Sequence, residues 1–172
     1  MNANRHLFES PRGDVVVPDT ALTALVLARA GTMPDAVAMI DGASGTSHTF
    51  GALAEAIHRL AGGFAALGVG PGERVALMAP NLPEFAIVFH AVALRGAAVT
   101  TINPTYGAEE IAFQLNDAKA TLLVTVPSFL EAATSGARAT AVTETIVIGE
   151  ADGHRSISDL AGDPVEQVPI DP

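Results

Sequence analysis

The 172-residue sequence contains no cysteine and no tryptophan, and only one tyrosine and one lysine, Lys119. Without cysteine, the chain cannot form a disulfide, a thiolate nucleophile or a cysteine-type metal site. A phosphate-binding loop of the Walker A type needs Gly-Lys followed by Ser or Thr, whereas Lys119 lies between two alanines. These absences exclude several kinds of self-contained active site.

Long apolar runs are also missing. The longest apolar stretch, residues 85–94, is interrupted by His90 and is far shorter than the roughly 20 residues that a membrane-spanning helix needs. Residues 1–10 contain no apolar segment of the kind that a secretory signal requires. We therefore expect no membrane span, no secretory signal and a cytoplasmic location.

The charge balance is acidic, with 19 Asp and Glu against nine Lys and Arg and a net charge of −10. A protein that binds nucleic acid through the phosphate backbone needs a basic face, so we expect no nucleic-acid partner. Half of the residues are apolar, and a chain of this length typically buries about 70% of its unfolded surface. The composition is that of a soluble globular α/β domain.

The apolar pattern alternates between helical and strand periods. Leu53, Ile57, Leu60, Phe64 and Leu67 follow one another at steps of four, three, four and three, which is the spacing of one helix face. Further helices are expected at 21–30, 82–95, 107–117 and 127–133. Strands are expected at 36–40 and 47–50 as a hairpin, and at 74–78, 98–102, 121–126 and 145–148.

This order predicts an α/β fold with a mostly parallel sheet and helices on both faces, because successive strand–helix–strand units pair in parallel with right-handed crossovers. Residues 1–20 are expected to be irregular, residues 21–150 to form the α/β subdomain, and residues 151–172 to be a linker toward further sequence. The helix at 82–95 is apolar almost all round, so it should be buried on more than one side. If their rings are fully buried, Phe85→Ala or Phe89→Ala should cost about 3–5 kcal/mol.

No residue stands out as a site. Gly68, Gly70 and Gly72 follow a helix and precede a strand, the reverse of a dinucleotide-binding fingerprint, so a helix stop and a turn explain them better. Glu109 and Glu110 are neighbours on a helix and point about 100° apart, which favours a role at the helix N-terminus over a shared site.

The histidines and serines do not form a catalytic pattern either. The histidines have no metal-ligand spacing, and the serines have no G-x-S-x-G context. His58 is expected to be solvated and His90 to be a hydrogen-bonded core or interface residue. The residues in question are His6, His48, His58, His90 and His154, and Ser44, Ser47, Ser128 and Ser135.

Four ordered segments nevertheless carry a specific family resemblance. Residues 64–76 resemble the Leu-Gly-Val turn and Arg-Val-Ala strand of adenylate-forming enzymes, and residues 79–85 resemble their Pro-Asn-x-Pro-Glu-Phe helix start. Residues 95–104 are similar to their Gly-Ala and Asn-Pro segment, and residues 110–125 to the helix and strand that follow it. Within this superfamily the chain most resembles the 4-coumarate–CoA ligases and fatty-acyl–CoA ligases (acyl-CoA synthetases).

The resemblance implies that this chain is the N-terminal subdomain of an ATP-dependent acid–CoA ligase, which uses ATP, Mg²⁺ and CoA to convert a carboxylic acid into its CoA thioester. It also implies that the phosphate loop, the acid pocket, the adenine-binding residues and a catalytic lysine lie in missing downstream sequence. No catalytic, cofactor-binding or metal-binding residue is therefore assigned to residues 1–172. We expect none of the three cofactors to bind tightly to this chain alone.

Two alternatives stay open. The chain could be a stand-alone binding or scaffold domain derived from such an enzyme, or an unrelated doubly wound protein that binds a small ligand at a topological switch point. If it is one part of a larger enzyme, some of its apolar surface should face the missing portion. The isolated chain is then expected to self-associate, with the helix at 82–95 as the expected contact.

Overall fold

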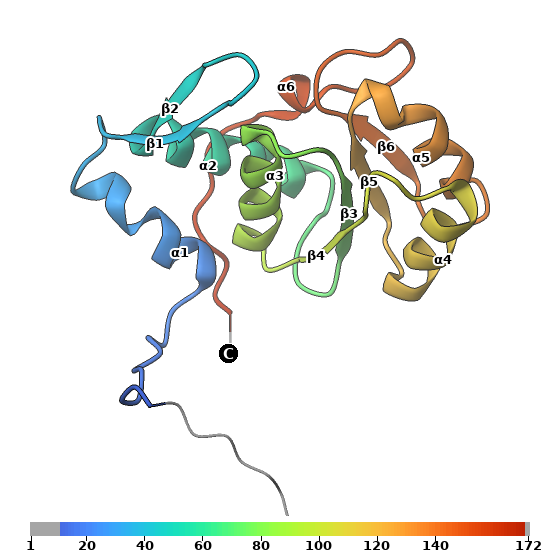
Figure 1. Cartoon of the computed structure of the whole chain (residues 1–172). Helices are drawn as coiled ribbons and strands as arrows, with labels where there is room; N and C mark the ends of the chain where they lie inside the picture. The colour runs from blue at the N-terminus through green and yellow to red at the C-terminus, as the bar shows by residue number, and fades with distance from the viewer. Residues whose placement is uncertain (1–10, 171–172) are drawn as a thin grey trace, which may run out of the picture.

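The computed structural model describes residues 11–170, which form one α/β unit built around a parallel sheet (Figure 1). The strands of this sheet lie in the order β4-β3-β5-β6, and all three pairings are parallel. A separate two-stranded antiparallel hairpin is formed by β1 and β2. The strands are β1 (Val37–Ile40), β2 (Ser47–Thr49), β3 (Arg74–Met78), β4 (Ala98–Thr101), β5 (Leu122–Thr125) and β6 (Glu144–Val147).

The helices connect these strands and cover both faces of the sheet (Figure 1). The α-helices are α1 (Leu22–Leu27), α2 (Phe50–Ala66), α3 (Pro83–Leu94), α4 (Ala108–Ala118), α5 (Leu130–Ala137) and α6 (Ile157–Leu160). Two short 3₁₀ helices, η1 (Ala28–Gly31) and η2 (Pro127–Phe129), precede β1 and α5. The predicted α/β class, with a parallel sheet between helices, is confirmed.

Alternation along the strands divides the core into two clusters. Val75 and Leu77 of β3 face the larger cluster with α2 and α3, whereas Ala76 and Met78 face the smaller cluster with α4 and α5. Successive side chains of a strand point to opposite faces, so a sheet covered by helices on both sides needs apolar residues at every position. This requirement explains the unbroken apolar runs in β3 and β5.

Local capping interactions set the starts of α2 and α4. Thr49 begins α2 as its N-cap and accepts a hydrogen bond from Ala52 N at 3.2 Å. At the start of α4, the Glu110 carboxylate accepts a hydrogen bond from Gly107 N at 2.9 Å, which satisfies a backbone donor that the helix leaves free. The sequence Asn-Leu-Pro-Glu at residues 81–84 predicts Asn81 as the cap of α3, but this prediction is wrong, because Leu82 occupies the N-cap and makes no side-chain cap. Pro83 follows it at N1, where a missing N–H costs nothing.

Residues 161–168, which we term the strap, cross α2 and α3 after α6 (Figure 1). Gly162 N donates to Arg59 O at 3.0 Å, Val165 N donates to His58 O at 3.3 Å, and Val168 N donates to Leu94 O at 2.9 Å. The His58 ring donates in turn from Nδ1 to Val165 O at 2.7 Å. His58 is thus half-buried and bonded to the strap, which differs from the solvated position expected from its place on the helix.

The strap and the last residue of α6 pack directly on two adjacent glycines of α2. A Cβ at Gly62 would overlap with Asp163 O, and a Cβ at Gly63 would overlap with Leu160 O. Glycine inside a helix is normally unfavourable by about 0.5–1 kcal/mol relative to alanine. The close approach of two backbones gives these glycines a packing role that offsets this cost.

We predict that Gly63→Ala destabilises the chain by about 1–3 kcal/mol, because the overlapping atom is a backbone carbonyl that cannot move without the strap. Limited proteolysis should cut residues 161–168 faster in the variant, and a urea melt gives the loss of stability. Gly70→Ala is the matched control, since a Cβ there meets nothing within 4 Å. A stabilised Gly63→Ala chain, as helix propensity alone would give, would show that the strap does not depend on this contact.

Candidate functional site

The strand order places a topological switch point between β3 and β5. From β3 the chain moves to β4 on one side, and from β4 it returns to β5 on the other side of β3. In sheets of this kind, ligands bind outside the carboxyl ends of the strands at the switch point. The carboxyl edge of β3, β5 and β6 is therefore the place where this fold would hold a ligand.

Backbone and side-chain hydrogen bonds fix this edge. The buried Thr125 hydroxyl at the end of β5 donates to Met78 O at the end of β3 over 2.9 Å. Ile148 N, just after β6, donates to Thr125 O at 2.7 Å. The three strand ends are thus joined in register, and Thr125 is satisfied within the fold and not left free for a ligand.

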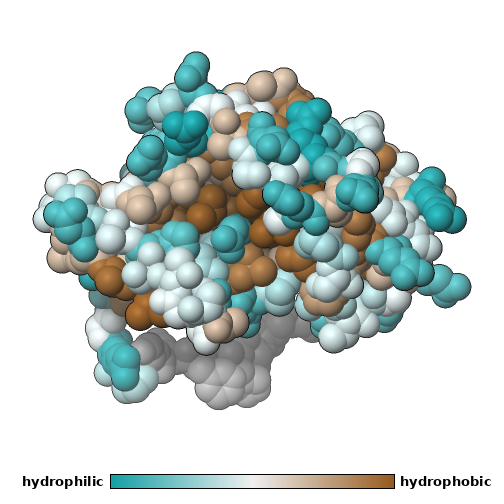
Figure 2. Space-filling model, turned by 90° about the horizontal axis from the view of Figure 1, so that it is seen from above, coloured by the Kyte–Doolittle hydropathy of each residue, from teal (hydrophilic) through white to brown (hydrophobic). Residues whose placement is uncertain are grey.

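A cleft of about 620 Å³ lies beside this edge, between α2, the start of α3, the end of β6 and α6. Its buried apolar lining includes Leu60, Ile87 and Ile148. Figure 2 looks onto this end of the molecule and shows apolar surface gathered in the middle of the face, with polar groups around it. The volume lies within the range of small-molecule sites.

The ionisable groups of the cleft are mainly acidic. Glu55, Glu84 and Glu150 line it together with one basic residue, Arg59. The ion pair between Arg155 and Glu144 lies outside this lining. A cleft with this charge balance disfavours the binding of a polyphosphate, because like charges repel in a partly enclosed space.

A second cleft, of about 360 Å³, lies on the other side of the start of α3 and is lined by residues of the β1–β2 hairpin, including Met39 and Ile40, and by Leu82 and Phe85. The turn after β1 is held by Asp41. The Ser44 hydroxyl donates to this carboxylate, and that bond, with the backbone bond from Ala43, holds the pKa of Asp41 below its usual value. This low pKa has a structural cause in the turn and does not mark a catalytic acid.

Three histidines of the described chain make hydrogen bonds that serve the fold. His58 bonds the strap, and His154 Nδ1 donates to Thr145 O at 3.2 Å. His90 Nδ1 lies 3.1 Å from the hydroxyl of the buried Thr23 and ties α1 to α3, and its burial lowers the pKa of the imidazole. This arrangement agrees with the hydrogen-bonded core or interface role expected for His90. His6 lies outside the described residues.

No metal centre is formed within residues 11–170, since they contain no group of three or more His, Cys, Asp or Glu side chains placed to hold an ion. The same part of the chain has no helix that is long and apolar enough to cross a bilayer. Lys119 ends α4 in the left-handed region at φ 54°, away from any glycine-rich loop. The assignment of no site residue to this chain stays a prediction, and the clefts are features that only the tertiary fold creates.

Comparison with known proteins identifies a family. Residues 26–171 match the family of AMP-binding enzymes. Among curated proteins, 4-coumarate–CoA ligase 5 of Oryza sativa subsp. japonica is 38% identical over 125 residues, which cover 72% of this chain and 23% of the rice protein. The 4-coumarate–CoA ligase of Pinus taeda is 36% identical over 127 residues, covering 73% of this chain and 24% of the pine protein.

Solved structures give the same fold. A long-chain-fatty-acid–CoA ligase from Archaeoglobus fulgidus superposes with a TM-score of 0.86 at 24% identity, covering 95% of this chain and 34% of that one. A putative long-chain-fatty-acid–CoA ligase from Rhodopseudomonas palustris superposes with a TM-score of 0.79 at 30% identity, covering 88% of this chain and 39% of that one. The chain spans about a quarter of the length of the curated relatives that it matches.

Proposed function

Because this chain belongs to the family of AMP-binding enzymes, we propose that it forms the N-terminal part of an ATP-dependent carboxylic acid–CoA ligase. The observation that carries the proposal is the family match over residues 26–171, which agrees with the order of the four sequence segments and with the fold of solved CoA ligases. In this proposal, residues 11–170 supply the helix-covered parallel sheet on which the rest of the enzyme is built.

The proposed reaction has two steps. A carboxylate is a poor electrophile, so its oxygen first attacks the α-phosphorus of ATP and pyrophosphate leaves, which gives an acyl-adenylate. The thiol of CoA then attacks the acyl carbon, and AMP leaves as the acyl-CoA thioester forms. Adenylation replaces a poor leaving group, the oxide of the carboxylate, by a better one, AMP, and the thiol then displaces the AMP.

The described residues do not fit ATP or Mg²⁺. The ionisable groups of the clefts are mainly carboxylates, the single lysine caps a helix, and no group of metal-ligating side chains is present within residues 11–170. Magnesium is usually held by one or two carboxylates together with substrate phosphates, so it would accompany ATP to whichever part binds the nucleotide. We therefore derive no catalytic step from residues of this chain.

For the acid, we propose a 4-coumarate-like aromatic acid or a fatty acid. The curated relatives that support the first are 4-coumarate–CoA ligases, and the solved structures that support the second are fatty-acid–CoA ligases. The alternative is a stand-alone binding or scaffold domain. This alternative is favoured by the two core clusters, one on each face of the sheet, and by the cleft of about 620 Å³, all of which are formed by residues of this chain.

The test uses the protein purified from its natural source. Its intact mass is measured, and it is incubated with ATP, Mg²⁺ and CoA and with 4-coumarate, benzoate or hexadecanoate in turn. We expect a mass well above the 17.5 kDa of this chain and formation of a CoA thioester from at least one acid. If the protein from its natural source has a mass of 17.5 kDa and forms no thioester, the result would support the stand-alone domain instead.

A further inference from the structure

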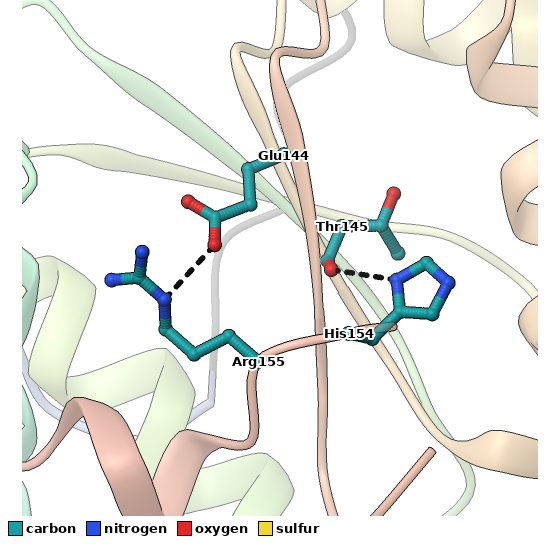
Figure 3. Close-up of polar contacts among 4 residues, drawn as sticks. All are labelled: Glu144, Thr145, His154 and Arg155. Atoms are coloured by element: carbon teal, nitrogen blue, oxygen red, sulfur yellow. Dashed lines mark hydrogen bonds and ion pairs between the residues drawn. The ribbon is translucent and has the colours of Figure 1, made fainter. Parts of the chain in front are cut away.

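The two edges of the parallel sheet differ in how they are protected. At the β6 edge, the segment 154–156 lies alongside the strand (Figure 3). Val147 N donates to Arg155 O at 2.9 Å, His154 Nδ1 donates to Thr145 O at 3.2 Å, and Arg155 Nε lies 3.1 Å from the Glu144 carboxylate. This edge is therefore closed by the chain itself.

The β4 edge is open. Ala98 N and Ile102 N donate to Glu73 O and Leu77 O, next to and within β3. Because successive peptide groups of a strand point to opposite sides, the N–H and C=O groups of Val99 and Thr101 point away from β3. On this outer side, the Gln114 side chain donates from Nε2 to Thr101 O at 2.9 Å. A carbonyl oxygen has two lone pairs, so Thr101 O can still accept a second bond.

The sequence of β4 lacks the features that usually prevent an edge strand from pairing with another strand. Natural edge strands are usually protected by charged residues, proline or a bulge, whereas β4 reads Ala-Val-Thr-Thr and pairs regularly with β3. Two large exposed side chains lie beside it, Phe113 at 75% exposure and Tyr106 at 36%. Both line a groove of about 640 Å³ between β4 and α4, together with Thr100 and Gln114.

We propose that β4 is an interaction surface at which a second copy of this chain pairs, strand to strand and antiparallel. The outward groups of Val99 and Thr101 lie two residues apart, so a two-fold axis through Thr100 brings Val99 opposite the partner's Thr101 and Thr101 opposite the partner's Val99. Each opposed pair forms two backbone hydrogen bonds, which makes the edge self-complementary. The same axis places Phe113 close to its counterpart across the interface.

Charge sets the strength of this contact. Glu109, Glu110 and Asp117 line the groove, and the two-fold axis brings them near the same residues of the copy. Their repulsion opposes pairing at low ionic strength and is screened by salt. Four strand residues and one aromatic contact per copy make an interface of the weak, transient class.

The chain could also self-associate through a second apolar surface. Nine of the large exposed apolar residues lie within residues 15–40, among them Leu25 and Val26 of α1. The one strand within that surface, β1, is paired irregularly with β2, with a register shift between Val37 and Met39, whereas β4 is paired regularly with β3. The open edge of β4, in contrast, specifies its partner as another strand. The helix α3, which the sequence suggested as the contact, is largely buried in the core.

The test is sedimentation equilibrium of the 172-residue chain up to about 1 mM, where weak interfaces are populated. We expect a monomer–dimer equilibrium that strengthens as salt is raised from about 0.05 to 0.5 M. Thr101→Pro removes an outward N–H that no β3 bond uses, and it should lower the association constant about tenfold or more, because each dimer loses two strand bonds. Phe113→Glu changes only an exposed helix residue and should weaken association similarly.

Leu25→Asp is the control on α1, where Leu25 is 51% exposed, and it should leave the association constant unchanged. Circular dichroism checks that each variant is folded. The proposal is overturned if the chain is monomeric throughout, if Thr101→Pro and Phe113→Glu associate like the parent chain, or if Leu25→Asp alone abolishes association. Because no readout involves ATP or an acid, these outcomes are independent of the proposed enzymatic function.

Discussion

Phe64→Ala should lower the free energy of unfolding by about 3–5 kcal/mol, the range found for the removal of a fully buried aromatic ring. Phe64 is completely buried in α2 and is the largest of the fully buried side chains. It belongs to the larger core cluster, where α2 and α3 meet the β3, β5 and β6 side of the sheet. The end of α6 and the strap pack on α2 next to this position, at Gly63 and Gly62, so the surrounding backbone has little room to collapse into the cavity.

Phe85→Ala is the matched comparison. Phe85 of α3 is only partly buried and packs at the margin of the same cluster, and Phe89 has the same environment. The sequence had suggested a large cost for these two rings on the condition of full burial, and that condition is not met. Their truncation should therefore cost clearly less than that of Phe64.

Urea unfolding of the parent chain, Phe64→Ala and Phe85→Ala, followed by circular dichroism, measures the loss in the free energy of unfolding for each variant. The comparison requires two-state transitions with similar slopes. A loss below about 1 kcal/mol for Phe64→Ala, the size of a surface change, would contradict its burial. Equal losses for Phe64→Ala and Phe85→Ala would contradict the arrangement of the core.

Elements with a strong local pattern could be predicted from the sequence. The stripe formed by Leu53, Ile57, Leu60 and Phe64 is buried in α2 as its spacing required. The apolar run of β3 is covered on both faces, and Thr49 and Glu110 occupy their helix starts as caps. In each of these cases the interaction lies within a few residues, so local periodicity and capping chemistry decide the structure.

Features that depend on long-range contacts could not be predicted. The strap bonds residues that are more than 70 positions away, as Val168 does with Leu94 O, and nothing in its polar sequence indicates that partner. One signal was available, because two adjacent glycines inside a helix pattern often mark a close backbone approach. The boundary expected at residue 151 falls before α6 and the strap, both of which pack on α2, and a linker role for residues 151–172 stays a prediction.

The clefts could not be predicted from the sequence, because they too depend on long-range contacts. The cleft of about 620 Å³ is lined from α2, α3, the end of β6 and α6, which lie up to about a hundred positions apart in the sequence. No sequence motif indicates such a cleft. The family resemblance, in contrast, depends on four local segments and could be read directly, and the family match over residues 26–171 confirms it.

This chain has the fold of an AMP-binding enzyme, and our central proposal is that it does not by itself carry the groups that perform adenylation. Its one lysine caps α4, the ionisable groups of its clefts are mainly carboxylates, and residues 11–170 hold no cluster of metal-ligating side chains. Catalysis of phosphoryl and adenylyl transfer depends on positioned positive charge around the phosphates, so we expect no adenylation by this chain alone.

The measurement that tests this claim most directly is the acid-dependent exchange of labelled pyrophosphate into ATP by the pure 172-residue chain. It is run with Mg²⁺ and with 4-coumarate, benzoate or hexadecanoate, beside a blank without protein and a sample of the natural protein. We expect exchange equal to the blank for the 172-residue chain, and acid-dependent exchange for the natural protein with at least one acid. Acid-dependent exchange well above the blank with the 172-residue chain alone would contradict the claim.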